Sequence, residues 1–168
     1  MTFNSYTFIV FFAAVLLLQR MPFGWRGKKS MLLVASYFFY AAWNPPFVVL
    51  LWISTIVDWF VAKRLANAAE RRSRKALLSI SLCSNLGMLG FFKYGNFLQE
   101  NFAEFCRMLG FEFQPATWDI VLPMGISFYT FQTLSYTLDI YFRRMKPCSS
   151  FLDYALYVTF FPQLVAGP

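Results

Sequence analysis

The stretch LPMGISFYTFQTLSYTLDIYFRR, residues 122–144, decides the fold class of this chain. It is apolar and long enough to cross a bilayer as a helix, yet it carries many hydrogen-bonding side chains. At about 100° per residue, these side chains fall on one helical face, and apolar side chains occupy the other. The polar face holds Tyr129, Gln132, Thr133, Tyr136 and Asp139, and the apolar face holds Phe131, Leu134, Leu138 and Tyr141. Because lipid excludes the polar face, the stretch predicts a two-faced membrane helix.

The composition of the whole chain supports a membrane protein. Hydrophobic residues make up 58% and charged residues 14%, which is more apolar surface than a soluble domain of 168 residues can bury. We therefore predict a single all-α domain over residues 1–168, a polytopic transmembrane helical bundle of about six spans. The predicted spans cover residues 3–19, 31–43, 46–62, 76–97, 120–142 and 151–168. An amphipathic helix at 98–110 is expected either on the membrane surface or packed over neighbouring spans.

The distribution of Lys and Arg predicts the orientation of these spans. Four basic residues follow the first span, six follow the third and three follow the fifth, which accounts for thirteen of the 15 in the chain. Six spans place all three segments on one side, and basic loops stay on the cytoplasmic side. The N-terminus is therefore predicted outside. The net charge of +7 is explained by this topology, so we expect no nucleic-acid partner.

The polar residues inside the spans have two interpretations. Any one of them is better explained as a hydrogen bond between helices, whereas the whole stripe with Asp139 favours the lining of a cavity. Asp58 lies five residues before Lys63, so we expect it at the cytoplasmic interface. Pro162 should kink or end the sixth span, because proline lacks the backbone donor that a helix interior requires.

Several types of site find no support in the sequence. The chain has no histidine, the commonest general base and metal ligand. Its three cysteines follow no metal-ligand spacing, so we expect no metal and no disulfide framework. Glycine-rich nucleotide loops and the serine-hydrolase motif are absent as well.

Three segments carry a resemblance to a known family: NLGMLGFFKYGNF (85–97), LPMGISFYTFQTLSYTLDIY (122–141) and FLDYALYVTFFPQLVAGP (151–168). Together they resemble the membrane-bound O-acyltransferases, in the bacterial branch that O-acetylates polysaccharides such as alginate. The resemblance implies a multi-pass inner-membrane enzyme that moves an acyl group, expected to be acetyl from acetyl-CoA, to polysaccharide hydroxyls through a tunnel. It also implies periplasmic acetylation partners and an intramembrane histidine that deprotonates the hydroxyl.

The missing histidine makes this chain an expected N-terminal fragment that is inactive alone, and no catalytic residue can be assigned to it. Tyr129, Gln132, Tyr136 and Asp139 are the candidates for lining the substrate tunnel. Two other functions fit the same polar residues: a polytopic transporter or channel, and a non-catalytic scaffold of a polysaccharide-export complex.

Overall fold

The computed structural model describes residues 5–111, 122, 123 and 125–166. Within these residues all regular structure is helical, which confirms the all-α prediction. The helices are α1 (Tyr6–Arg20), α2 (Trp25–Ala41), α3 (Pro46–Asn67), α4 (Arg71–Met108), α5 (Ile126–Tyr141), α6 (Phe151–Thr159) and α7 (Phe161–Ala166). Every predicted span has a helical counterpart, although α2 begins six residues before the predicted start at residue 31 and takes Arg26, Lys28 and Lys29 into its first turns.

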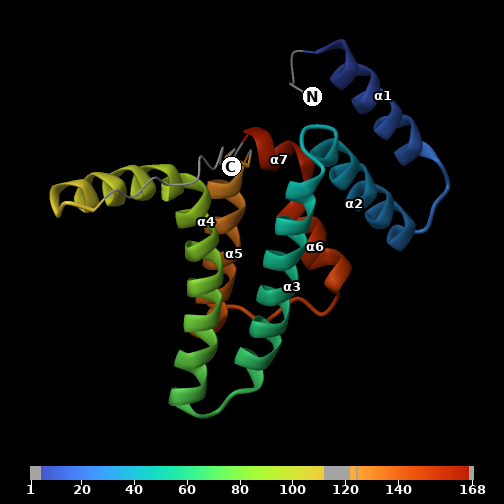
Figure 1. Cartoon of the computed structure of the whole chain (residues 1–168). Coiled ribbons are helices and arrows are strands. Elements are labelled where there is room, and N and C mark those ends of the chain that lie inside the picture. The colour runs from blue at the N-terminus through green and yellow to red at the C-terminus, as the bar shows by residue number, and fades with distance from the viewer. Residues whose placement is uncertain (1–4, 112–121, 124, 167–168) are drawn as a thin grey trace.

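Helices α3, α4 and α5 stand side by side and form the centre of the molecule (Figure 1). The sequence Asn-Pro-Pro at residues 44–46 separates α2 from α3, and Pro46 occupies the first turn of α3, where its missing N–H costs nothing. Among the described helices, α3 and α4 are long and apolar enough to cross a membrane. The structure therefore identifies two candidate spans, and the number six remains a prediction.

Helix α4 joins two segments that the sequence predicted separately. The predicted span at 76–97 and the amphipathic helix at 98–110 form one continuous helix, whose last part turns aside from the central bundle (Figure 1). On this last part, Leu98, Phe102, Phe105 and Leu109 are each more than half exposed. The placement of this segment, on the membrane surface or over neighbouring spans, stays a prediction.

The buried face of α4 is not the face that carries its small residues. Ser79, Cys83 and Gly87 recur every four residues, a spacing that lets helices approach closely, but all three are exposed in the described structure. The buried side chains lie about half a turn away, at Arg74, Ser81, Asn85 and Leu89.

Two helices end in the same backbone motif with different residues. After α4, Gly110 has a φ of 81°, and the N–H groups of Gly110 and Phe111 donate to the carbonyls of Arg107 and Cys106. After α5, Arg143 takes the glycine position with a φ of 59°. Its backbone N–H donates to the Ile140 carbonyl, and the backbone N–H of Arg144 donates to the Asp139 carbonyl. This Schellman motif normally uses glycine, because a side chain in left-handed backbone costs about 1–2 kcal/mol.

The predicted sixth span is broken, as Pro162 suggested. Helix α6 ends at Thr159 and α7 begins at Phe161, with Phe160 in a non-helical conformation between them. The break frees the Tyr157 carbonyl and the Phe161 N–H, which would bond to each other in a continuous helix. Gln132 of α5 donates to the Tyr157 carbonyl at 2.7 Å, and the hydroxyl of Ser36 in α2 accepts from the Phe161 N–H at 3.2 Å. Both freed groups are therefore satisfied by side chains of other helices.

Candidate functional site: a buried polar cluster and an apolar pocket

A cluster of polar side chains fills the contact between α3, α4 and α5. It is built from residue pairs spaced four apart, a spacing that puts both members on one face of a helix. The pairs are Ser54 and Asp58 on α3, Ser81 and Asn85 on α4, and Thr133 and Thr137 on α5. All six side chains are buried, so three helices place their polar faces against one another inside the bundle.

Asp58 and Asn85 connect the three helices. The Ser81 hydroxyl donates to Asp58 Oδ1 at 2.5 Å, and Asn85 Nδ2 donates to Asp58 Oδ2 at 2.7 Å. The oxygen of Asn85 accepts from the hydroxyls of Ser54, at 2.8 Å, and Thr133, at 3.2 Å. Each carboxylate oxygen of Asp58 thus has a donor, which makes the network a stable link between helices in an apolar setting.

Neighbouring helices cover Asp58, a contact that the sequence interpretation did not predict. Its exposed fraction is 0% and its side chain lies between α3 and α4. Its depth at the cytoplasmic interface, expected because Lys63 follows closely, stays a prediction, whereas its access to water is determined by the tertiary contact. Ser81 and Asn85 were missed altogether, and the available signal was their spacing of four, which matches that of Ser54 and Asp58 on the preceding helix.

Aromatic side chains pack near this cluster. Tyr154 of α6 is fully buried and lies between Trp59 and Tyr136, with ring centroids 5.8 Å and 4.6 Å away. Its hydroxyl is the one buried side-chain polar atom of the described residues that has no hydrogen-bond partner. The site therefore combines a satisfied polar network with one hydroxyl that retains hydrogen-bonding capacity.

The four predicted tunnel residues take different positions. Tyr129 and Tyr136 are buried on the bundle-facing side of α5, as their helical face predicts. The Tyr129 hydroxyl contacts the sulfur of Met88 at 4.0 Å, and the Tyr136 hydroxyl accepts from the Cys148 N–H at 2.9 Å. Gln132 lies at the edge of this face and bonds to the broken helix. Tyr129 and Tyr136 therefore share a buried face but have different partners.

Asp139 departs from the predicted inward orientation. Its side chain is 44% exposed and lies 3.8 Å from Arg144. Because Asp139 occupies the last turn of α5, the chain reverses beside it and brings Arg144 within reach. The carboxylate inside the described bundle is that of Asp58.

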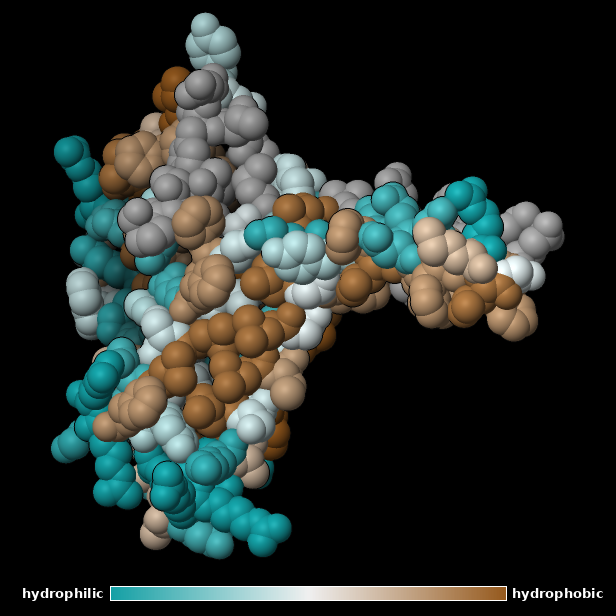
Figure 2. All heavy atoms as spheres, turned by 90° about the vertical axis from the view of Figure 1, so that its left-hand side faces the viewer, coloured by the Kyte–Doolittle hydropathy of each residue, from teal (hydrophilic) through white to brown (hydrophobic). Residues whose placement is uncertain are grey.

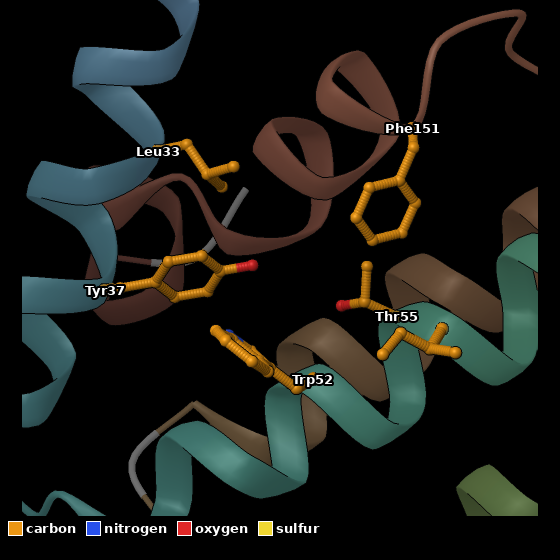
Figure 3. Close-up of a pocket in the computed structure, with 6 residues that line it drawn as sticks. Leu33, Tyr37, Trp52, Thr55 and Phe151 are labelled. Carbon is orange, nitrogen blue, oxygen red and sulfur yellow. The ribbon is translucent and has the colours of Figure 1, made fainter.

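An apolar pocket of about 270 Å³ opens between α2, α3 and α6. Figure 3 shows Tyr37 and Trp52 next to each other on one side of it, with ring centroids 5.8 Å apart, and the Phe151 ring and the Thr55 side chain on the other side. The Thr55 hydroxyl donates to its own helix, at the Leu51 carbonyl, so it adds little polarity. A pocket with this lining accommodates an apolar group better than a polar one.

The residues that could bind a metal ion do not cluster in the described part of the chain. No group of three His, Cys, Asp or Glu residues gathers within the described ranges. Because the chain has no histidine, these residues cannot supply a histidine general base. The polar cluster can organise helices and border a substrate path, and the apolar pocket can hold a hydrophobic group.

Comparison with known proteins identifies the class to which these helices belong. The chain is 36% identical to the probable alginate O-acetylase of Pseudomonas aeruginosa, an alignment that covers all of this chain and 32% of that relative. It is 34% identical to the probable alginate O-acetylase of Azotobacter vinelandii over all of its length and 34% of that relative. It is also 36% identical to a peptidoglycan O-acetyltransferase of Helicobacter pylori, over 83% of this chain and 30% of that relative.

These relatives confirm the resemblance found in the sequence. The chain is a membrane protein related over its full length to the bacterial polysaccharide O-acetylases of the membrane-bound O-acyltransferase family. It spans about a third of the length of these curated relatives. No family model and no solved structure matches it.

Proposed function

We propose that this chain forms part of an O-acyltransferase that transfers acetyl groups to hydroxyls of a bacterial surface polysaccharide. The observation that carries the proposal is the similarity of the complete chain to O-acetylases of alginate, supported by a similar peptidoglycan enzyme. Alginate is the first candidate acceptor, acetyl-CoA the candidate donor, and periplasmic acetylation proteins the candidate partners. The proposed location is the inner membrane, crossed six times with the N-terminus outside.

We assign the 168 residues a role in the wall of the substrate path, with the general base supplied from outside them. In this proposal Tyr129, Gln132 and Tyr136 line the path, and Asp139 lies at its mouth. The burial of the two tyrosines and the broken helix held by Gln132 support it, because irregular backbone at membrane depth occurs where it borders protein or a cavity. A protein-lined path would keep bulk water from the thioester.

A gene deletion tests the activity. Ester-linked acetate on the surface polysaccharides is measured in the parent strain, in a deletion strain and in strains complemented with the complete gene or with codons 1–168. We expect acetate to be lost on deletion, restored by the complete gene and not restored by codons 1–168. Unchanged acetate in the deletion strain would contradict the proposal and favour a transporter or a scaffold.

Conservative variants of the complete gene test the assigned residues. Tyr129→Phe and Asp139→Asn each remove a polar function and keep the shape of the side chain. At equal protein level in the membrane we expect each to lower acetylation. Phe131→Leu is the control, because Phe131 is 61% exposed on the opposite face. Acetylation unchanged in both variants would exclude these side chains from the substrate path.

A further inference from the structure

A basic pocket of about 510 Å³ opens where α3 and α5 end and α4 begins. The chain between α3 and α4 forms one wall, and the segment after α5 forms the other. Four cationic side chains, Arg74, Arg143, Arg144 and Lys146, line the pocket, and no carboxylate is among its described lining residues. Figure 2 shows hydrophilic side chains gathered at the lower end of the molecule, below a broad apolar surface.

Arg74 builds the inner wall of this pocket. It is 7% exposed, and its guanidinium donates to the carbonyls of Leu65 and Ala68 at the end of α3 and to those of Ile140 and Tyr141 at the end of α5. Carbonyls at helix C-termini carry partial negative charge and would repel an anion. Arg74 donates hydrogen bonds to four of these carbonyls and so offsets their negative charge. The positive charge of the other three cationic side chains therefore determines the charge of the pocket.

The backbone conformation of Arg143 is a second feature of this pocket. This residue occupies the left-handed position of a helix-ending motif that uses glycine at the end of α4, so its backbone is strained where Gly110 is relaxed. Strained residues persist where surrounding structure holds them, and they gather at binding sites. The strained residue here places a guanidinium in the lining of the pocket.

The neighbouring charges leave this pocket positive. Two acidic groups lie beside it: Asp139 is 3.8 Å from Arg144 Nη1, a separation too long for a direct hydrogen bond, and Glu70, which follows the lining residue Ala69, accepts from the Ser73 hydroxyl. The Arg144 side chain is 73% exposed and can turn toward a ligand. Guanidinium groups bind phosphate oxygens in pairs of parallel hydrogen bonds, which suits a tetrahedral oxyanion in this pocket.

We propose that this pocket binds a phosphate-bearing anion, held by Arg143, Arg144 and Lys146 against the wall that Arg74 forms. Basic pockets between the ends of membrane helices bind the head groups of anionic lipids. The same chemistry would hold the phosphate of a soluble ester that reaches the membrane surface. The proposal concerns this pocket alone and does not depend on acyl transfer.

Native mass spectrometry of the full chain in a neutral detergent tests the proposal. The protein is titrated with phosphatidylglycerol, with diacylglycerol, which lacks the phosphate, and with coenzyme A as a soluble phosphate ester. We expect binding of at least one phosphate compound and no comparable binding of diacylglycerol. Binding of phosphatidylglycerol alone identifies a lipid head group, and binding of coenzyme A alone identifies a soluble ligand. Equal binding of all three compounds, or of none, would overturn the proposal.

Substitution of Arg143 separates binding from folding. Arg143→Gly removes the charge and relieves the backbone, so the thermal midpoint should hold or rise while phosphate affinity falls about fivefold. Arg143→Lys keeps a charge and should retain most of the affinity. Arg71→Gln removes a nearby exposed charge outside the pocket and serves as the matched control. An equal loss of affinity in Arg71→Gln and Arg143→Gly would show general surface attraction and refute a defined site.

Discussion

At the residue scale, Asp58 organises the contact between three helices. Its two oxygens accept from Ser81 and Asn85, and Asn85 in turn accepts from Ser54 and Thr133. A buried carboxylate is costly unless donors surround it, and here the donors come from side chains on the next helix. The polar groups that make α3 a poor lipid-facing helix therefore specify which face of α3 meets α4.

Replacement of Asp58 should destabilise the bundle. Asp58→Ala removes the acceptor at 2.5 Å from the Ser81 hydroxyl and at 2.7 Å from Asn85 Nδ2, and we expect a loss of about 2–3 kcal/mol in the free energy of unfolding. Asp58→Asn keeps the shape and one acceptor and should cost less. Denaturant unfolding in detergent measures both, with the half-exposed Asp139→Asn as control. The network would carry no stability if Asp58→Ala behaved like this control.

At the element scale, the break between α6 and α7 is held by two other helices. Ser36 accepts from the N–H after the break, and Gln132 donates to the carbonyl before it. The break also brings Phe161 against Phe11 of α1 and Phe39 of α2, with ring centroids 5.3 Å and 5.6 Å away. The irregular backbone thus fixes the position of α7 among α1, α2 and α5.

Removal of the Ser36 hydroxyl should weaken this junction. Ser36→Ala leaves the buried Phe161 N–H without a partner, which should cost about 1–3 kcal/mol. Ser30→Ala is the matched control, because Ser30 lies on the same helix and is exposed. Thermal unfolding of the two variants in detergent provides the comparison. Identical midpoints would mean that the proline alone maintains the break.

Helix α4 shows which helix ends can be predicted from a sequence. No proline interrupts residues 71–108, so nothing in the local sequence required a helix end near residue 97. The change from an apolar segment to an amphipathic one was visible in the sequence, and it predicted two environments along this stretch. It did not predict that one helix would serve both, because a change of environment requires only a bend.

At the scale of the whole molecule, the segment between α3 and α4 and the segment after α5 lie together, although they are distant in sequence. Asn67 and Lys146 line the same pocket, while the Asn-Pro-Pro turn at 44–46 lies at the other end of α3 (Figure 1). The proposed topology requires this grouping, because the loops after the third and fifth predicted spans must share one side of the membrane.

Cysteine labelling tests that orientation. In a background in which Cys83, Cys106 and Cys148 are replaced by alanine, single cysteines are introduced at Asn44, Asn67 and Lys146. We expect a membrane-impermeant reagent applied outside intact cells to label Asn44→Cys and to leave the other two unlabelled until the membrane is opened. Labelling of Asn67→Cys and Lys146→Cys from opposite sides would contradict the topology.

The sequence by itself determined the class of protein, the helical segments and the break at Pro162. These properties depend on local composition and periodicity: apolar length selects membrane helices, and proline lacks a backbone donor wherever it falls. The family resemblance also came from contiguous motifs. Tyr129 and Tyr136 were predicted correctly as buried, since helical geometry alone puts them on the polar face of α5.

Only the tertiary structure decided which polar groups meet. Asp58 is buried and Asp139 half-exposed because neighbouring helices cover the first and a chain reversal exposes the second. Ser81, Asn85 and Arg74 gained their roles from partners on other helices, up to 67 positions away in the chain. Burial and hydrogen bonding depend on contacts between helices, and the periodicity of one helix does not determine which face of its neighbour it meets.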